Sequence, residues 1–335
     1  MAADATAMFR EAAEAPARVR AQLALNAPAV AALAARLRAA APRAVVTFGR
    51  GSSDHAATYL RYLIETRLGV MTASAPPSVS SVYDAAPDMQ GMLCIVISQS
   101  GRSPDLLAAA QAAAAAGATV VALVNDETSP LAAQADVVLP LHAGPELSVA
   151  ATKSYICALT AAAQLVGCWL EDAELLAALE SLPERLDEAW SRPWPQAEAR
   201  LVAARGLYVL GRGPGFGIAQ EAALKFKETC GLHAEAFSAA ELRHGPMALV
   251  GPGFPILAFV QADETQAGVE AAVAACVAQG AEVLQVGGRD QAGVCRLPAA
   301  AAHPALEPIN RGLTEDVTAS TVSGNTSHSE SRLQL

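Results

Sequence analysis

Aromatic side chains and positive charge are both scarce in this chain. Aromatic residues make up 4% of the 335 residues and hydrophobic residues 53%, so Ala, Val and Leu must build the interior. That composition suits helices packed on buried parallel strands. The formal net charge of −10 excludes an extended nucleic-acid-binding surface, because a phosphate backbone requires clustered Lys and Arg. It does not exclude a small anionic ligand, since a local site can be positive on an acidic protein.

The chain also lacks the patterns of metal sites, export signals and membrane spans. Its six cysteines show no metal-ligand spacing, and most lie among apolar residues, which predicts buried thiols in a reducing cytoplasm. Arg10, Glu11 and Glu14 interrupt the N-terminal region, so no signal peptide is expected. The Ala-rich stretch 108–116 is too short to span a membrane. We therefore expect a cytoplasmic protein with no membrane contact and no metal.

Apolar runs and helical patterns alternate through the first half of the chain. Two helices are predicted within 4–41, with a break near Asn26 and Pro28, where the proline removes a helix hydrogen bond. The buried strands expected after them lie at 44–48, 92–97, 119–124 and 137–141, and the helices at 55–67, 105–116 and 153–169. This alternation predicts an α/β fold in which a parallel sheet carries helices on both faces.

The second half of the chain repeats the first. The segment 207–213 matches 45–51, the segment 254–261 matches 92–99 at the same offset, and 278–286 matches the region from Ala115 with a slip of one residue. Two copies of one α/β unit explain this similarity.

The predicted organisation follows from the repeat. It comprises N-terminal helices at 1–42, a first α/β domain at 43–172, a helical connector at 173–200, a second α/β domain at 201–309 and an atypical tail at 310–335. The tail is rich in Ser, Thr and Asn and poor in apolar residues, so we expect it to be disordered.

Three strand-to-helix turns of the first copy are rich in hydroxyl groups. They are 51–53, 98–103 and 150–153, and in an open α/β sheet they lie at the edge where ligands bind. A single serine at such a position is usually a helix N-cap. Three such turns favour a phosphate site, formed by the hydroxyls and the positive end of a helix dipole. The second copy has Val-Gln-Ala-Asp-Glu-Thr at 260–265, so only the first copy is expected to bind phosphate.

A dinucleotide-binding site is the alternative, because Gly211 and Gly213 follow a predicted strand. The third glycine of that motif is missing, since Phe216 occupies its position, and no acidic residue ends the next strand. The pattern therefore favours a phosphate site without a nicotinamide cofactor.

The candidate catalytic residues lie in the second copy. Glu221, Lys225 and Glu228 are spaced to share one face of a predicted helix, where a carboxylate near a lysine could act as a general base. The simpler interpretation of that segment alone is a solvated charged face. The polar stretch 233–246 shifts the balance, because His244 precedes Gly-Pro in a predicted turn, where a histidine can transfer protons.

Together these motifs resemble the sugar isomerase (SIS) superfamily, and most of all the isomerase half of glucosamine-6-phosphate synthase and the related single-chain deaminases. The matching segments are 51–53, 98–101 with Ser103, 151–153, 221–228 and 241–246, and the resemblance covers residues 30–309. It implies two tandem SIS domains, each a parallel sheet flanked by helices. No glutamine-hydrolysing half precedes the first copy, so the chain is expected to release ammonia or isomerise rather than transfer nitrogen from glutamine.

The resemblance also implies a role for each site residue. The phosphate of the sugar would be held by Ser53, Ser98, Gln99, Ser100 and Ser103. Glu228 would move the proton between C1 and C2 of the open-chain sugar, and His244, which in such families comes from the other subunit of a homodimer, would open the ring. Val149 would give backbone contacts to the sugar, while Lys225 and Glu221 would support the site. The substrate implied is a sugar 6-phosphate, and no metal or other cofactor is needed.

Two departures from the family pattern affect this site. Ala151 stands where the family has a serine, and 310–335 contains no lysine, whereas relatives end in an ordered tail whose lysine reaches the sugar. The predicted function is deamination of glucosamine 6-phosphate to fructose 6-phosphate and ammonia. The alternatives are a fructosamine-6-phosphate deglycase, a phosphosugar isomerase and a sugar-phosphate sensor without turnover. Retention of Glu228 and His244 speaks against the sensor.

Overall fold

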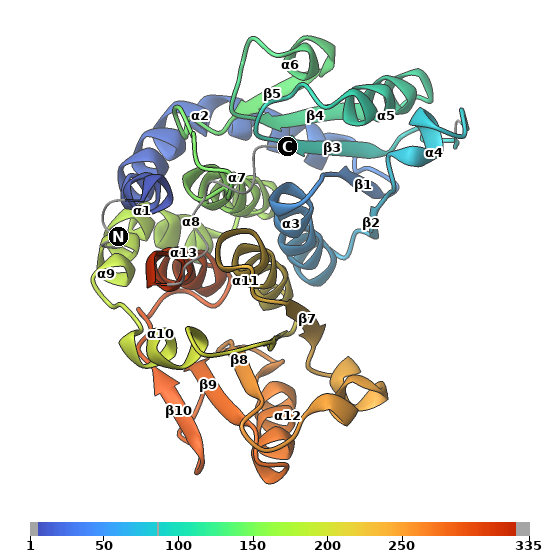
Figure 1. Cartoon of the computed structure of the whole chain (residues 1–335). Helices are drawn as coiled ribbons and strands as arrows, with labels where there is room; N and C mark the ends of the chain where they lie inside the picture. Colours follow the sequence, from blue (N-terminus) through green and yellow to red (C-terminus); the bar gives the residue numbers. More distant parts are fainter. Residues whose placement is uncertain (1–5, 86, 326–335) are drawn as a thin grey trace. The chain divides into compact units, whose positions relative to one another are not determined.

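The computed structural model describes residues 6–85 and 87–325, which form two compact units (Figure 1). The first-sheet unit contains 17–146 and 153–183, and the second-sheet unit contains the described parts of 1–16, 147–152 and 184–335. Each unit holds a five-stranded sheet in which every strand pairing is parallel. The predicted α/β fold of two tandem domains is therefore confirmed.

The first sheet has the strand order β2-β1-β3-β4-β5. Its strands are β1 (Val45–Phe48), β2 (Thr72–Ser74), β3 (Leu93–Ser98), β4 (Thr119–Val124) and β5 (Val137–Pro140). The helices of this unit are α3 (Ser52–Leu68), α4 (Ser78–Ser81), α5 (Pro104–Ala115), α6 (Pro130–Gln134), α7 (Lys153–Leu170) and α8 (Ala173–Glu180). In this order the chain reverses direction across the sheet between β1 and β3, which places the topological switch point at their carboxyl ends.

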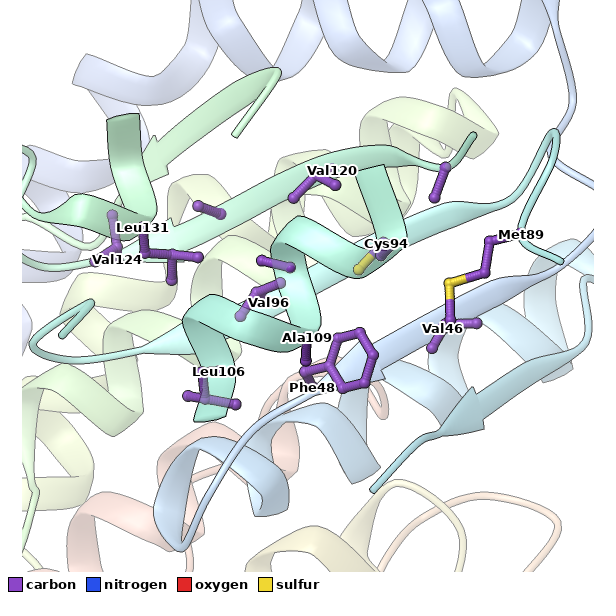
Figure 2. Close-up of a cluster of buried hydrophobic side chains, with 14 residues drawn as sticks. Val46, Phe48, Met89, Cys94, Val96, Leu106, Ala109, Val120, Val124 and Leu131 are labelled. Carbon is purple, nitrogen blue, oxygen red and sulfur yellow. The ribbon is translucent and has the colours of Figure 1, made fainter. Parts of the chain in front are cut away.

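Alternate strand residues divide between the two faces of the first sheet, as the period of a strand requires. Val46 and Phe48 of β1 and Val96 of β3 point to one face, where they pack against Leu106 and Ala109 of α5 (Figure 2). Helix α3 contacts β1 and β3 and also packs on α7. Strands β1 and β3 are buried along their whole length, which accounts for their largely apolar sequences.

The second sheet has the order β7-β6-β8-β9-β10, which is the topology of the first. Its strands are β6 (Leu207–Gly211), β7 (Ala234–Ser238), β8 (Pro255–Val260), β9 (Glu282–Gly287) and β10 (Val294–Leu297). The helices are α9 (Leu182–Trp190), α10 (Pro195–Leu201), α11 (Gly215–Cys230), α12 (Gln266–Ala278) and α13 (Glu307–Asn325), with short 3₁₀ turns η2 (Glu241–His244) and η3 (Pro246–Leu249). In residue number, β6 begins as far after β1 as β8 begins after β3, whereas β9 begins one residue further after β4. The structure therefore confirms both the repeat and its slip of one residue.

The N-terminal helices break at a different place from the one predicted. Helix α1 (Ala7–Ala13) ends at Glu14, and α2 (Ala15–Ala39) continues through Pro28. The predicted break near Asn26 and Pro28 is therefore wrong. Proline removes one backbone hydrogen bond, but side-chain contacts of this stretch compensate, because the Asn26 amide donates to the Pro140 carbonyl oxygen at 2.8 Å and Gln22 donates to that of Cys157 at 3.0 Å.

The described part of the tail is helical, which differs from the prediction. The composition predicts disorder over 310–335, yet α13 runs to Asn325, and most of its described side chains are buried; 326–335 lies outside the described residues. The hydroxyl of Thr318 donates to the Thr314 carbonyl oxygen at 3.1 Å, and that of Thr314 lies within 3.2 Å of the Asn310 carbonyl oxygen. Because these hydroxyl groups are satisfied within the helix, a polar sequence can be buried, which composition alone does not reveal.

All six cysteines are free thiols, and four of them are buried. Burial raises the pKa of Cys94 to about 12, so this thiol stays protonated and unreactive at neutral pH. Within the described ranges, no helix is both long enough and apolar enough to cross a membrane.

Candidate functional site

The turn from β1 into α3 places Ser53 at the start of a helix. Gly51 precedes the helix with φ of +53°, a left-handed conformation that glycine adopts without strain. A Cβ atom at Gly49 would lie 2.7 Å from the Asp54 backbone nitrogen, so the chain passes too close for any side chain there. The turn therefore depends on both glycines, and it leaves the half-buried Ser53 in the first turn of α3.

The turn from β3 into α5 carries three of the predicted serines and Gln99. The Ser98 Oγ, almost fully buried, accepts a hydrogen bond from the Gly101 N–H at 3.1 Å, and the Ser100 Oγ accepts one from the Arg102 N–H at 3.4 Å. Both hydroxyl groups thus act as acceptors toward the backbone, and within the described residues no acceptor takes their protons. They can donate those protons to an anion.

Ser103 and Gln99 behave differently from these two serines. Ser103 immediately precedes α5, and its hydroxyl donates to Asp105 Oδ1 at 2.9 Å instead of capping the helix. The half-buried Gln99 is held through its main chain, where its carbonyl oxygen accepts from the Asn125 N–H at 3.2 Å. The turn is therefore fixed mainly by backbone contacts.

The two turns lie together at the switch point of the first sheet. Strands β1 and β3 are neighbours, and the guanidinium of Arg50 in the first turn pairs with Asp105 in the first turn of α5, with Nε 2.9 Å from Oδ2. The hydrogen bond from Arg50 is the main reason that the pKa of Asp105 is held below its usual range. Two helix N-termini and several serine hydroxyls thus occur at one sheet edge, an arrangement suited to an oxyanion.

Gly101 is the position on which this turn should depend most. Its φ is +62°, and a Cβ atom there would lie 2.2 Å from the Ser129 Oγ. Gly101→Ala should lower the free energy of unfolding by about 3 kcal/mol, through both backbone strain and a clash. Gly69→Ala is the matched control, since Gly69 has φ of +67° with nothing within 4 Å, and it should lose only about 1 kcal/mol. Urea denaturation of both variants measures the difference; equal losses would show that the clash is relieved at no cost.

Val149 lies on an exposed loop of the second-sheet unit. Its side chain is 60% exposed, and the loop is held by the Glu11 carboxylate, which accepts from the Leu147 N–H at 2.6 Å and the Ser148 N–H at 3.1 Å. The backbone beside Val149 is thereby fixed while its side chain stays in solvent. Glu11 could not be found from the sequence, because an acidic residue in an amphipathic helix predicts only a solvated face.

The next feature is the charged face of α11. Glu221 and Lys225 are fully buried and paired with each other, and the Lys225 Nζ also lies 3.2 Å from Asp316 Oδ1 of α13. Burial alone would lower the pKa of Lys225, but the carboxylates of Asp316, Glu221 and Glu315 outweigh it and raise the pKa above its usual value. The ammonium is therefore charged and enclosed. Asp316 was missed because it lies in the stretch expected to be disordered.

Glu228 sits in the last turn of α11, where it is half-buried. The residues after it are tied to α13, because the Ser323 hydroxyl donates to the Thr229 carbonyl oxygen at 2.8 Å and the Cys230 thiol lies 3.5 Å from the Ala319 carbonyl oxygen. Helix α13 thus holds the end of α11 that carries the proposed base.

The buried carboxyl group of Glu315 makes the stability of the fold depend on pH. Burial first, and then the neighbouring Asp316, raises the pKa of Glu315 well above its usual range, and neither carboxyl oxygen has a hydrogen-bond partner within the described residues. A raised pKa in the folded state stabilises the fold below the usual glutamate pKa and loses that contribution as the pH rises through the folded value. Glu315→Gln should therefore stabilise the protein more at pH 8 than at pH 5. Urea denaturation at the two pH values tests this, and a pH-independent difference would contradict it.

His244 ends the 3₁₀ turn η2 of the second-sheet unit, as the predicted turn required, and its side chain is exposed. The turn stops at Gly245, whose φ of +135° few other residues adopt. Just beyond it, the Tyr208 hydroxyl donates to the Pro246 carbonyl oxygen at 3.3 Å. An exposed imidazole on a fixed turn is able to exchange protons with a ligand.

The predicted site residues therefore fall into two groups. The serines and Gln99 belong to the first-sheet unit, and Val149, Glu221, Lys225, Glu228 and His244 to the second-sheet unit. In the part of the chain that the structure describes, no three His, Cys, Asp or Glu side chains are grouped to hold a metal ion.

The structure contains two copies of a parallel five-stranded sheet, with a serine-rich turn at the switch point of the first. This arrangement is that of the α/β proteins built from sugar isomerase domains. Sequence comparison agrees, because the SIS domain matches residues 40–167 and 200–326. The chain belongs to the SIS domain family, and the resemblance predicted from its motifs is confirmed.

The similar proteins differ in how much of their length they share with this chain. A glutamine–fructose-6-phosphate aminotransferase (isomerizing) of Zymomonas mobilis is 31% identical over 276 residues, which are 77% of this chain and 45% of the relative. One of Bradyrhizobium diazoefficiens is 37% identical over 64% of this chain and 37% of the relative. The chain thus spans less than half the length of these curated relatives.

Among solved structures, a protein of Silicibacter pomeroyi provisionally named a phosphosugar isomerase is 42% identical and superimposes with a TM-score of 0.92. The match covers 96% of this chain and 98% of that one. A glucosamine-6-phosphate deaminase of Thermotoga maritima, 21% identical with a TM-score of 0.78, shares the fold.

Proposed function

We propose that this chain is an enzyme that acts on a sugar phosphate by aldose–ketose chemistry. The observation that carries the proposal is the turn 98–103, in which Ser98 and Ser100 keep their hydroxyl protons for a ligand at the switch point of the first sheet. The names of the relatives support it, since the 42% identical structure is provisionally called a phosphosugar isomerase and the curated relatives are isomerizing enzymes of a hexose 6-phosphate.

The reaction we propose is conversion of glucosamine 6-phosphate and water to fructose 6-phosphate and ammonia. His244 opens the ring by moving a proton from the O1 hydroxyl to the ring oxygen. Glu228 then takes the proton from C2 and returns it to C1, while the amino group gives up one proton and O1 gains one, which converts the amino aldose to the C2 imine of fructose 6-phosphate. Water adds to the imine carbon, and the carbinolamine loses ammonia to leave the C2 ketone. One carboxylate, one imidazole and a phosphate anchor are sufficient for these steps.

Lys225 and Glu221 have a supporting role in this proposal. Their side chains are buried and ion-paired, so they shape α11 from inside. Homodimer formation is part of the same proposal, with His244 given by the other subunit, and size-exclusion chromatography with light scattering tests it.

Incubation with glucosamine 6-phosphate, followed by enzymatic assay of ammonia and fructose 6-phosphate, tests the reaction. Equal amounts of the two products are expected. Interconversion of a phosphosugar without ammonia would indicate the isomerase alternative, and binding without any product would indicate a sensor; either would overturn the deaminase proposal. A Ser98→Ala/Ser100→Ala variant should raise KM for the phosphorylated sugar at least about tenfold, because two hydrogen bonds to a charged group are removed.

A further inference from the structure

The second copy has lost the serines of the phosphate site but keeps much of its framework. Gly213, with φ of +60°, stands in the repeat where Gly51, with φ of +53°, stands in the first copy. Strand β8 ends at Val260 as β3 ends at Ser98, and helix α12 follows β8 at the spacing at which α5 follows β3. Ala262 therefore occupies the place in the repeat that Ser100 occupies in the first copy.

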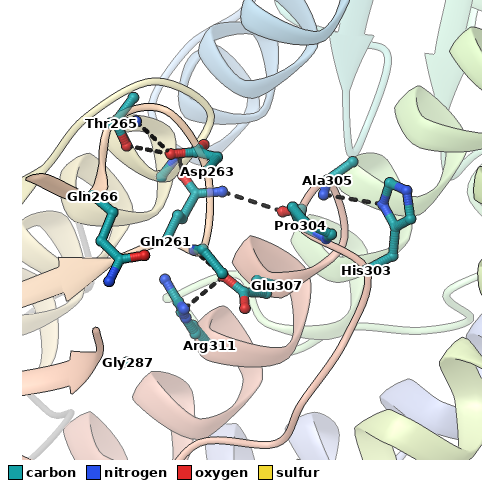
Figure 3. Close-up of polar contacts among 12 residues, drawn as sticks. Gln261, Asp263, Thr265, Gln266, Gly287, His303, Pro304, Ala305, Glu307 and Arg311 are labelled. Carbon is teal, nitrogen blue, oxygen red and sulfur yellow. Dashed lines mark hydrogen bonds and ion pairs between the residues drawn. The ribbon is translucent and has the colours of Figure 1, made fainter. Parts of the chain in front are cut away.

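An acidic side chain of the protein itself occupies the anion-binding position at Ala262. The Glu307 carboxylate, from the first turn of α13, accepts a hydrogen bond from the Ala262 N–H at 3.0 Å. The same Oε2 atom accepts from Arg311 Nη2 at 2.7 Å (Figure 3). A negatively charged oxygen thus binds at the turn that leads into α12, as a phosphate oxygen would.

The first copy differs at the equivalent atom. Within residues 6–85 and 87–325 the Ser100 N–H makes no hydrogen bond. The same backbone donor is therefore open in one copy and occupied by a carboxylate in the other.

The guanidinium of Arg311 provides a buried positive charge at this anion-binding position of the second copy. Its side chain is 6% exposed, and its Nη1 has no hydrogen-bond partner among the described residues. The guanidinium lies against Gly287, where a Cβ atom would be 2.6 Å from Nη2 and 2.4 Å from the Val260 carbonyl oxygen. A buried cation with a spare donor can bind an anion larger than one carboxylate.

The turn itself is fixed by its neighbours. The Gln261 amide, which is buried, donates to the Pro304 carbonyl oxygen at 3.2 Å (Figure 3). Asp263 accepts from the Thr265 N–H at 2.8 Å, and its charge also acts on Arg311. The negative charge of Asp263 would weaken binding of a dianion, so millimolar rather than micromolar affinity is expected.

We propose that the second copy retains an anion-binding site and that Glu307 is its intramolecular ligand, which fastens the start of α13 to the turn before α12. With the carboxylate removed, the site would take inorganic phosphate. This goes beyond the proposed function, which concerns the phosphate site of the first copy.

The test is rescue of a Glu307 variant by phosphate. Ser98→Ala and Ser100→Ala first weaken the site of the first copy, and Glu307→Ala is then added to this background. The melting temperature should fall by about 5 °C. Inorganic phosphate at about 50 mM should restore at least half of that loss, relative to sodium chloride of equal ionic strength. Glu264→Ala in the same background is the matched control, because it removes an exposed carboxylate from the same turn. It should show only the general stabilisation that phosphate gives to any folded protein.

Equal phosphate responses of the Glu307→Ala and Glu264→Ala proteins would overturn the proposal. If Glu307→Ala does not fold in chloride, its refolding yield in phosphate replaces the melting temperature, and no gain in yield would count against the proposal. Glu307→Asp keeps a carboxylate and should respond to phosphate less than Glu307→Ala; an equal response would exclude the carboxylate as the ligand. Failure of the proposed function would instead appear as unaltered substrate use by the Ser98→Ala/Ser100→Ala protein, which the Glu307 measurements do not affect.

Discussion

Glu228→Gln should lower kcat for glucosamine 6-phosphate by at least about 1,000-fold and leave KM within a few-fold. Transfer of a proton by a positioned carboxylate contributes about 10² to 10⁴ to the rate, and the amide cannot accept the C2 proton. The substitution keeps the size of the side chain in the last turn of α11, where Thr229 and Cys230 remain tied to α13. Ammonia release and loss of deuterium from C2-labelled substrate both measure the step.

Glu264→Gln is the control for this substitution. It makes the same chemical change at an exposed position of the second-sheet unit and should leave kcat unchanged. If Glu228→Gln retained more than one tenth of the activity, Glu228 would be excluded as the base. The chemistry would then have to be assigned to another group.

Lys225→Met should lower the free energy of unfolding by about 3–5 kcal/mol. The substitution leaves Glu221 and Asp316 buried without their counter-ion, and removal of one partner of a buried ion pair is far more destabilising than loss of an exposed pair. Lys227→Met is the matched control, two residues along the same helix, where the side chain is exposed; it should change stability by no more than about 0.5 kcal/mol.

A triple variant separates the charge effect from packing. Combination of Lys225→Met with Glu221→Gln and Asp316→Asn removes the uncompensated charges and should recover most of the lost stability. Urea denaturation measures all three proteins. A Lys225→Met protein as stable as the Lys227→Met control would show that the ammonium does not neutralise the buried acids.

The repeat was the most predictable part of this fold. Strand β4 has the predicted bounds, and α12 follows β8 at the same spacing as α5 follows β3. These elements could be predicted because buried parallel strands have continuous apolar sequences, and the two copies of such a sequence can be recognised. The edge strands β2, β7 and β10 were not predicted. Thr72–Ser74 has only three residues, too few for a periodic signal.

The residues of the candidate site also divide into those that the sequence predicts and those that it does not. Ser98 and Ser100 could be found from sequence, since hydroxyls after a buried strand occur at the ligand-binding edge of such a sheet. Asp316 and Ser323 could not, because their partners Lys225 and Thr229 lie far away in the chain and the stretch between is polar. Burial of such a helix depends on Thr314 and Thr318 bonding their own backbone, which only the three-dimensional arrangement reveals.

The contact between α1 and α13 of the second-sheet unit has a consequence for the order of folding. The Thr6 hydroxyl lies 2.7 Å from the Ser320 hydroxyl, so α1 packs on a helix that is synthesised much later. On the ribosome, the strands of the first sheet emerge as a continuous block and can assemble early. Helix α1 must wait until α13 has left the exit tunnel. Completion of the second-sheet unit therefore follows the synthesis of α13, and a chain stalled before that point would expose the apolar face of α1 to chaperones.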